Sequence, residues 1–214
     1  MRVVTAQELQ SVDPAKFQRE YSSWCEYALD YEWWDCTYES FKSDMEKFGV
    51  SVEKIYFSVS CSQSDYASFE GTVDVGEWME QNKEGDQTYA EAYPALYLAV
   101  KDYGGCSTVS TGYRDSWPSL NWDGACVGNT FPSGIFQHLE QEAWDELVEE
   151  QYRSADLEKM MQEWINDKCR ELYDQLYEES GYLTSEEQFI ESCDCNEVTF
   201  EIEDEDEEET CDTL

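Results

Sequence analysis

Helical spacing of apolar residues marks the first part of the chain. Asp13 followed by Pro14 is typical of a helix start, because an Asp side chain caps free backbone N–H groups and proline suits the first helical turn. A second helical stretch is expected from about residue 31 to residue 48, with Gly49 as its stop. The pattern therefore predicts that the chain opens with helices.

Strand-like alternation replaces this spacing after Gly49. Apolar Ile55, Phe57 and Val59 alternate with more polar residues, as expected of a strand with one buried face. Alternation of this kind predicts four strands, near 52–61, 67–75, 106–113 and 197–202. The first two are close enough in sequence to pair as a hairpin. A helix is expected to open at Pro94 and to run to about residue 103, and residues 114–134, rich in glycine and proline, are expected to form an irregular loop.

Helical periodicity returns in the C-terminal third. Apolar residues recur at helical spacing over residues 139–176, a length for which we expect a break near Ser154 rather than one continuous helix. Residues 184–187 have the spacing of a capping box and are expected to open a last short helix. The pattern as a whole predicts an α+β fold, in which a small antiparallel sheet packs with several helices and the C-terminal third forms long helices. We expect one acidic domain over residues 1–203 and a disordered acidic tail over residues 204–214.

Acidic residues greatly outnumber basic ones. The 214 residues include 50 Asp and Glu against 13 Lys and Arg, which gives a formal net charge of -37 at pH 7. Aromatic residues make up 15% of the chain, too many for a disordered acidic protein. Residues 201–214 hold nine acids and no base, so a charge of -28 remains on the preceding 200 residues. The charge is therefore a property of the folded body, and its self-repulsion opposes folding.

The sequence lacks the patterns expected of a membrane-spanning segment, a metal site or a cofactor site. No run approaches the roughly 18 apolar residues that a membrane helix needs, and the first residues lack the apolar stretch of a secretory signal. An anionic membrane surface would repel this chain, so we expect it in the cytosol. The nine cysteines lack the paired close spacing of zinc ligands, and one histidine cannot complete a His-rich site. Reduced thiols are favoured over zinc, and we expect no metal and no cofactor.

Two short segments resemble family motifs. Residues 60–71 follow a predicted strand and read S-C-S-Q-S-D-Y-A-S-F-E-G, and residues 182–187 read Y-L-T-S-E-E. They are similar to the S-Q-G-D-G-A-S-F-x-G and Y-L-T-S-[DE]-E motifs of uncharacterised acidic proteins encoded by phages, with Ser64 and Tyr66 where glycines are usual. Some members of that group carry an antitoxin label. The resemblance implies a phage origin, and hence the cytosol of a host cell, but no mechanism and no catalytic residue.

Acidic residues form rows on the predicted C-terminal helices. Side chains three or four positions apart on a helix lie about 5–6 Å from each other, so acids at this spacing line one face. The rows are candidate partner-binding residues: Glu142, Glu146, Glu149 and Glu150 on the first helix, and Glu163, Asp167, Glu171, Asp174 and Glu178 on the next. One DNA strand carries a charge every ~3.4 Å, so a single row is too sparse and a mimic needs two rows side by side. The alternative is an ordinary solvated helix face.

Two further segments are candidates for binding. Acids and aromatic residues are combined in residues 30–35, where Asp30, Glu32, Trp33, Trp34 and Asp35 could meet Arg or Lys on a partner. The alternative is a helix junction whose tryptophans enter the core. Ser62, Gln63 and Asp65 form a polar loop between two predicted strands that could bind a ligand. A turn in which Asp65 bonds its own backbone is the favoured interpretation of that loop.

Together these observations favour a binding protein over an enzyme, because the sequence carries no motif of a nucleophile elbow, a phosphate-binding loop or a metalloprotease. The main hypothesis is a nucleic-acid mimic, specifically a DNA mimic. It would inhibit a host nuclease, restriction enzyme or nucleoid protein by occupying its basic groove, without itself binding nucleic acid. In number, 37 charges equal those of about 18 base pairs. The alternative is an antitoxin-like inhibitor that binds one protein through an aromatic and acidic patch. The third hypothesis is an enzyme that works from the loop at Ser62 or from Cys106. The oligomeric state stays open.

Overall fold

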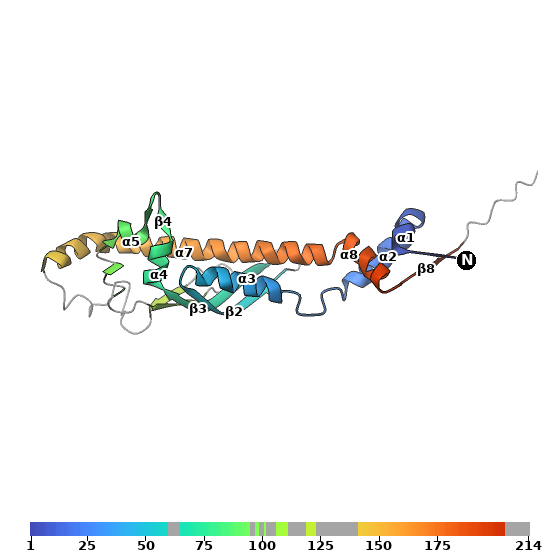
Figure 1. Ribbon diagram of the computed structural model, residues 1–214, viewed down its shortest axis with the longest axis horizontal. Coiled ribbons are helices and arrows are strands. Elements are labelled where there is room, and N and C mark those ends of the chain that lie inside the picture. The colour runs from blue at the N-terminus through green and yellow to red at the C-terminus, as the bar shows by residue number, and fades with distance from the viewer. Residues whose placement is uncertain are drawn as a thin grey trace, which may run out of the picture. The chain divides into compact units, whose positions relative to one another are not determined.

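The computed structural model describes residues 1–59, 65–94, 97–98, 101, 106–110, 119–122 and 141–203, and for residues 84, 106–110, 119–122 and 141–159 it describes the backbone only. The fold is α+β with small antiparallel sheets, as the sequence predicts (Figure 1). The chain divides into two compact units. We call Met1–Trp33 with Glu178–Leu214 the split unit and Trp34–Tyr177 the central unit. The single domain expected over 1–203 stays a prediction, and the expected tail at 204–214 lies outside the described residues.

The split unit is built from both ends of the described chain. It contains β1 (Arg2–Val4), α1 (Ala6–Val12), α2 (Pro14–Cys25), the last residues of α7 (Gln141–Leu183), α8 (Glu186–Cys195) and β8 (Phe200–Ile202). Strands β1 and β8 pair antiparallel, with Val3 opposite Glu201. The Lys16 ammonium donates a hydrogen bond to the backbone carbonyl of Glu201 and so fixes β8 to α2.

Side-chain caps set where these helices begin. Thr5 and Glu8 form a capping box at α1, in which each side chain accepts a hydrogen bond from the other's backbone N–H. The Asp13 carboxylate accepts from the Lys16 N–H at 2.9 Å and Pro14 follows it, which confirms the predicted start of α2. The predicted last helix is also confirmed as α8, but the predicted capping box at residues 184–187 is wrong. Ser185 is the N-cap and accepts from the Gln188 N–H, because the Thr184 hydroxyl donates to the Ser180 carbonyl instead. Caps of this kind are readable in sequence because they are local.

The core of the split unit forms around Phe189 of α8. Its ring centroid lies 5.5 Å from those of Phe17 and Trp24 and 5.8 Å from that of Tyr21. Val4, Ala6, Leu9 and Cys193 complete the buried cluster, and Phe200 and Ile202 of β8 pack against it. Residues from both chain segments are thus needed to bury one apolar surface.

A four-stranded antiparallel sheet organises the central unit. Its order is β2 (Val50–Ser58), β3 (Tyr66–Asp74), β6 (Cys106–Ser110) and β7 (Ser119–Trp122). The predicted hairpin is confirmed, because β2 and β3 are adjacent and antiparallel. The register shifts between Val52 and Lys54, and opposite this bulge Gly71 approaches so closely that a Cβ there would lie 2.1 Å from the Ser51 carbonyl oxygen. Only glycine fits at that position.

Helices bury the sheet of the central unit. Helix α3 (Asp35–Glu46) lies over β2 and β3 in Figure 1, and its Phe41 ring packs edge-to-face on Phe69 of β3 at 5.6 Å. The remaining elements are α4 (Val75–Gln81), the short strands β4 (Lys83–Glu84) and β5 (Gln87–Thr88), and α5 (Tyr89–Ala92). Trp164 of α7 joins these parts, since its ring lies 5.3 Å from Phe48 after α3 and 6.0 Å from Trp78 of α4.

Three predictions about elements are wrong. The strand predicted at 197–202 forms at Phe200–Ile202 but pairs with β1 in a sheet of its own, because Phe200 and Ile202 pack into the split-unit core. The helix predicted from residue 31 begins at Asp35, since the Trp33 N–H bonds to the Tyr31 carbonyl in a turn. No break occurs near Ser154. Residues 141–183 contain no proline and a single glycine, at position 181, so nothing in the backbone chemistry interrupts α7.

Other boundaries differ by a few residues or lie outside the described chain. Strand β2 begins two residues earlier than the predicted start at 52, and β6 starts at residue 106 as predicted. Strand β1 was not predicted, and β7 lies inside the expected loop at 114–134, most of which is outside the described residues. Within the helix predicted at 93–103, residues 94, 97–98 and 101 are described and are helical.

Candidate interaction surfaces

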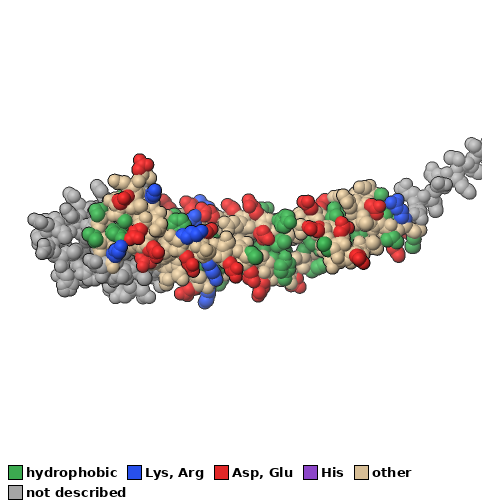
Figure 2. Space-filling view, viewed as in Figure 1, with side chains coloured by type: hydrophobic (Ala, Val, Ile, Leu, Met, Phe, Trp, Pro, Cys, Tyr) green, Lys and Arg blue, Asp and Glu red, His purple; other side chains and the backbone are tan. Residues whose placement is uncertain are grey.

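The acidic row predicted on the C-terminal helix lies on one exposed face of α7. Its acids, all exposed, are Glu163, Asp167, Glu171, Asp174 and Glu178. The opposite face is buried and contains Met161, Ile165, Leu172 and Leu176. Figure 2 shows acidic side chains spread widely over the visible face, with few Lys and Arg among them. The predicted amphipathic face is therefore present between residues 160 and 178.

Two cations on the same helix weaken the row. The Lys168 ammonium lies 2.6 Å from the Glu171 carboxylate, and the Arg170 guanidinium lies 3.3 Å from that of Asp167. Lys168 is only 22% exposed and lies over the rings of Phe48 and Trp164, at 5.7 and 5.8 Å from their centroids. The row extends over about 22 Å at roughly 1.5 Å per residue, where one DNA strand would carry six or seven charges. Five acids and two bases leave -3, about half of that number.

The first predicted row falls where the structure describes the backbone alone. Glu142, Glu146, Glu149 and Glu150 belong to α7, so they share one helix with the second row rather than forming a separate one. Their side chains lie outside the description. A second acidic row beside the first therefore stays a prediction.

The structure divides the predicted acidic and aromatic patch at residues 30–35. Asp30, Glu32 and Asp35 are exposed, whereas Trp33 is only 8% exposed. Trp34 is half-buried against Tyr38 and Phe57, with ring centroids at 6.4 and 5.3 Å. The tryptophans thus serve packing, as in the alternative interpretation of this segment, and the acids alone stay accessible. Burial, followed by the negative charge of Asp35, raises the pKa of Tyr38 to about 12.

The predicted ligand loop is only partly described. Ser62 and Gln63 lie outside the described residues. Asp65 is half-buried at the start of β3, and its carboxylate accepts a long hydrogen bond from the Ser58 hydroxyl at 3.5 Å. That contact ties the two strands of the hairpin together. It agrees with a structural role for Asp65.

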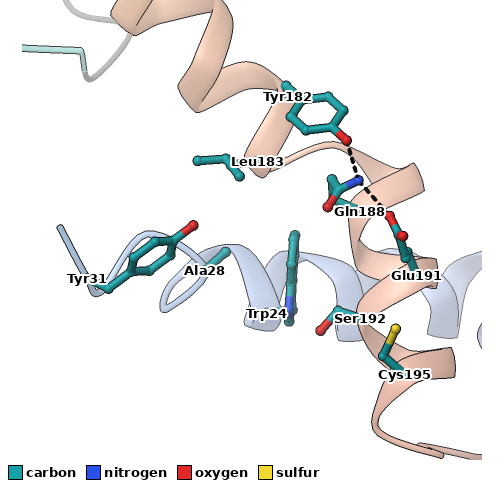
Figure 3. A pocket seen from close by; sticks show the side chains of 9 residues that line it. All are labelled: Trp24, Ala28, Tyr31, Tyr182, Leu183, Gln188, Glu191, Ser192 and Cys195. Carbon is teal, nitrogen blue, oxygen red and sulfur yellow. Dashed lines mark hydrogen bonds between the residues drawn. The ribbon is translucent and has the colours of Figure 1, made fainter. Parts of the chain in front are cut away.

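A pocket of about 430 Å³ lies within the split unit, at the surface between α2 and α8 (Figure 3). Three aromatic residues contribute to it. Tyr31 and Tyr182 are 55% and 56% exposed, and Trp24 is half-buried against Phe189. The full lining is Trp24, Ala28, Tyr31, Tyr182, Leu183, Gln188, Glu191, Ser192 and Cys195. No Lys or Arg is among these residues.

A hydrogen-bond network orders the α8 side of this pocket. The Gln188 amide donates to the Tyr182 hydroxyl oxygen at 3.0 Å and to the Glu191 carboxylate at 2.8 Å. The Gln188 backbone N–H in turn donates to the Ser185 hydroxyl. Nearby, the Tyr21 hydroxyl donates to the Thr184 carbonyl at 2.6 Å, which holds the α7–α8 connection against α2. Burial is the main cause that raises the pKa of Tyr21 to about 12.

A second, more acidic hollow of about 650 Å³ lies beside α8. Its lining is Gln7, Gln10, Glu186, Glu187, Ile190, Glu191, Asp194 and Cys195. Gln10 and Gln18 each donate a hydrogen bond of 2.9 Å to the Glu186 carboxylate, so one of these acids is structurally engaged. Both hollows share Glu191 and Cys195, so they adjoin at α8.

Sequence reasoning missed this pocket, although part of its signal was present. Tyr182 and Leu183 begin the Y-L-T-S-E-E segment. That segment resembles a family motif, but the resemblance predicts no pocket. Trp24 of α2 packs against Tyr21 and Phe189, as a residue of an apolar helix face does. The pocket itself could not be predicted, because its two sides are about 150 residues apart in sequence.

The described side chains offer little to covalent or metal chemistry. No group of three or more His, Cys, Asp or Glu residues is arranged to hold a metal ion in the part of the chain with described side chains. Cys25, Cys36, Cys193 and Cys195 form no disulfide bond. Burial raises the pKa of the Cys193 thiol, which favours its unreactive protonated form. Among the described helices, none is long and apolar enough to cross a membrane.

Comparison with known proteins identifies one similarity. Residues 33–113 match a family described as a domain of unknown function (DUF8835). The matched segment covers α3, the β2–β3 hairpin and β6 of the central unit. The residues that line the pocket of the split unit lie outside it. No curated protein and no solved structure matches the chain.

Proposed function

We propose that the protein is a phage-type acidic decoy that occupies the basic, nucleic-acid-binding groove of a host protein and inhibits it. The observation that carries this proposal is the distribution of cations. From Glu171 to Leu214 the sequence has 18 Asp and Glu and no Lys or Arg. Ordinary protein surfaces mix both signs, so a stretch of this length without a cation creates a strong local negative potential.

The acids of the split unit support the proposal better than the row on α7. On α7, Lys168 and Arg170 compensate part of the charge. On and after α8, Glu187, Glu191 and Asp194 are exposed, and so are Glu197, Glu201 and Glu203. No cation lies between them in the sequence. Among the described residues, a basic groove would therefore meet exposed carboxylates with no intervening cation in the sequence along α8, whereas Lys16 lies at β8.

The decoy would act through charge pairing and exclusion. Its field would steer a basic partner to it, and its carboxylates would pair with the Arg and Lys side chains that normally hold phosphates. Nucleic acid would then be displaced, and a nuclease could not cleave the decoy because a protein has no phosphodiester bonds. Host nucleases, restriction enzymes and nucleoid proteins are the natural targets for a phage protein. Pairing of this kind is fast and weakens with salt.

Competition with DNA tests the proposal. A labelled duplex of about 20 base pairs, enough to match the charge of the chain, is bound to a purified basic nuclease, restriction enzyme or nucleoid protein, and the full chain is added. We expect release of DNA, seen as a fall in fluorescence anisotropy. The apparent affinity should fall at least tenfold when NaCl is raised from about 50 mM to about 500 mM. Failure to displace DNA from any of these proteins at low salt would contradict the proposal.

Matched variants locate the effect. Neutralising Glu187, Glu191, Asp194 and Glu197 to Gln or Asn removes four charges from the split unit. Neutralising the exposed Asp44, Glu46, Glu53 and Glu77 removes four from the central unit. We expect the first set to weaken competition more than the second. Equal losses would assign the effect to net charge rather than to α8.

A second candidate is a specific, antitoxin-like inhibitor that binds one protein partner through an aromatic and acidic patch. The pocket with exposed Tyr31 and Tyr182 favours it. Affinity would then depend on these rings and only weakly on salt. Affinity purification from expressing cells separates the two candidates, because a single partner retained at high salt supports the inhibitor and basic proteins recovered only at low salt support the decoy.

A further inference from the structure

The pocket of the split unit combines aromatic faces with an ordered carboxylate (Figure 3). We propose that it receives an arginine side chain of a protein partner. The proposal deepens the proposed function, on which it rests for the basic nature of that partner. Net charge alone attracts a basic partner without fixing where it binds, and the arginine site would supply one defined point of contact.

The aromatic residues suit a guanidinium group. In Figure 3, Trp24 and Tyr31 come from the α2 side of the pocket, and Tyr182 lies across from them at the end of α7. The Trp24 ring is fixed by Phe189 at 5.5 Å and by Tyr21 at 6.4 Å, so one wall is rigid. A guanidinium is planar and weakly hydrated, and it stacks on aromatic faces more readily than an ammonium group does.

The carboxylate of Glu191 supplies the charge. One of its oxygens accepts the hydrogen bond from Gln188, whose amide also bonds Tyr182, so the carboxylate is tied to the aromatic wall. Its other oxygen has no hydrogen-bond donor among the described residues. The Ser192 hydroxyl lies on the same side of the pocket as a further acceptor. An arginine has five donors in a flat fork and can use several acceptors at once, which lysine cannot do in one plane.

The split unit does not neutralise this site itself. Its three cations are Arg2, Lys16 and Arg19, and none of them lines the pocket. Arg2 lies 3.9 Å from Glu8, and Lys16 is bonded to the backbone of Glu201. Any cation that pairs with Glu191 must therefore come from outside the split unit. A volume of about 430 Å³ falls within the usual range of ligand pockets and leaves room for the backbone beside the arginine.

Two peptides of equal charge test the proposal. One alternates four arginines with glycine, and the other carries four lysines at the same positions. Binding to the full chain is measured by calorimetry, and the Trp indole N–H signals are followed by NMR. We expect the arginine peptide to bind about tenfold tighter, the ratio that a stacking gain of about 1.4 kcal/mol gives. It should also shift one indole signal, from Trp24, that the lysine peptide leaves in place.

Matched substitutions separate the pocket from general attraction. Glu191→Gln removes the carboxylate, and Tyr31→Leu removes one exposed ring outside the core. Each should abolish the preference for arginine. Glu187→Gln removes the same charge one turn earlier on α8, at a residue that does not line the pocket, and should keep the preference. Circular dichroism and melting temperature check that each variant folds.

The possible outcomes test the arginine site and the decoy function separately. Equal affinity for the two peptides, or equal loss in the Glu187 and Glu191 variants, overturns the arginine site. If the Glu191→Gln protein still displaces DNA from a basic protein as well as the parent does, the arginine site fails for that partner and the decoy stands. If the parent shows the arginine preference but displaces no DNA, the decoy fails and the arginine site stands.

Discussion

The two units carry almost the same net charge on very different amounts of chain. The split unit has 22 Asp and Glu against 3 Lys and Arg in 70 residues, a net charge of -19. The central unit has 28 against 10 in 144 residues, a net charge of -18. The charge density of the split unit is therefore about twice that of the central unit. Total charge alone does not reveal which part of such a molecule is available to a partner.

The two units also differ in how far ion pairs neutralise their acidic side chains. In the central unit, described ion pairs join Lys47 to Asp44, Lys101 to Glu80 and Lys168 to Glu171. Hydrogen bonds from Tyr97 and Lys101 lower the pKa of Glu80. In the split unit, an ion pair joins Arg2 to Glu8 at 3.9 Å. Surface pairs add little stability, but they reduce the field that a partner meets.

Core truncation should have the largest effects and should test whether the units unfold separately. Phe189→Ala removes the ring around which the split-unit core packs, and Leu172→Ala removes a fully buried residue of the central unit. We expect losses of about 3–5 and 2–5 kcal/mol respectively. Hydrogen exchange should localise each loss to its own unit. Equal loss of protection in both units after either change would show one cooperative domain, as the sequence predicted.

Two glycine substitutions should act with opposite signs. Gly71→Ala places a Cβ 2.1 Å from the Ser51 carbonyl oxygen and should destabilise the central unit by about 1–3 kcal/mol. Gly181→Ala places a methyl in open space on α7, so it should stabilise the split unit by about 0.5–1 kcal/mol. Denaturant unfolding measures both. A stabilising Gly71→Ala would mean that the bulge opposite it relaxes.

Alkaline pH should weaken both units through one half-buried tyrosine in each. The pKa values of Tyr21 and Tyr38 are raised from 10.0 to about 12. Between these values the unfolded chain loses the proton while the folded chain keeps it, so stability is full below pH 10 and falls as the pH rises towards 12. Tyr21→Phe should remove this slope from the split unit alone, with a loss of about 1 kcal/mol at pH 7 from the missing hydrogen bond to Thr184. An unchanged slope in the split unit would contradict the assignment.

Salt should produce the smallest effect and the most direct comparison. Screening reduces repulsion between like charges. NaCl should therefore stabilise the split unit, which has fewer cations, more than it stabilises the central unit. We expect a gain of about 1 kcal/mol or less for the split unit and a smaller gain for the central unit. Hydrogen exchange at about 50 mM and about 500 mM NaCl measures both, across a range in which the screening length falls severalfold. A larger gain in the central unit would contradict this account of charge compensation.

Local chemistry decided which parts of the fold were predictable. The starts of α2 and α8 follow from Asp13 and Ser185, and the β2–β3 hairpin follows from alternating residues. The pairing of β1 with β8 was missed because β1 has only three residues, too few to show a period, and its partner strand lies at the other end of the described chain. The burial of Trp33 was one of two interpretations that the sequence left open, since aromatic residues serve cores and interfaces equally well.

For the candidate sites, too, local features were predictable from sequence and contacts between distant segments were not. Exposure of Glu163, Asp167 and Glu171 follows from helical spacing, which is local. The ion pairs of Asp167 with Arg170 and of Glu171 with Lys168 have a spacing of three residues, which is local, but only the structure shows which acids the cations engage. The pocket requires residues 24–31 to meet residues 182–195, and no local pattern encodes such a meeting.

The division of the split unit between two chain segments has a consequence for synthesis. The 144 residues of the central unit must leave the ribosome before the partner segment of residues 1–33 exists. At about 5–20 residues per second this takes roughly 7–30 s. During that time Leu9 and Phe17 have no Phe189 to cover them. The central unit can fold first, and the nascent N-terminal segment depends on its own solubility, or on a chaperone, until α8 emerges.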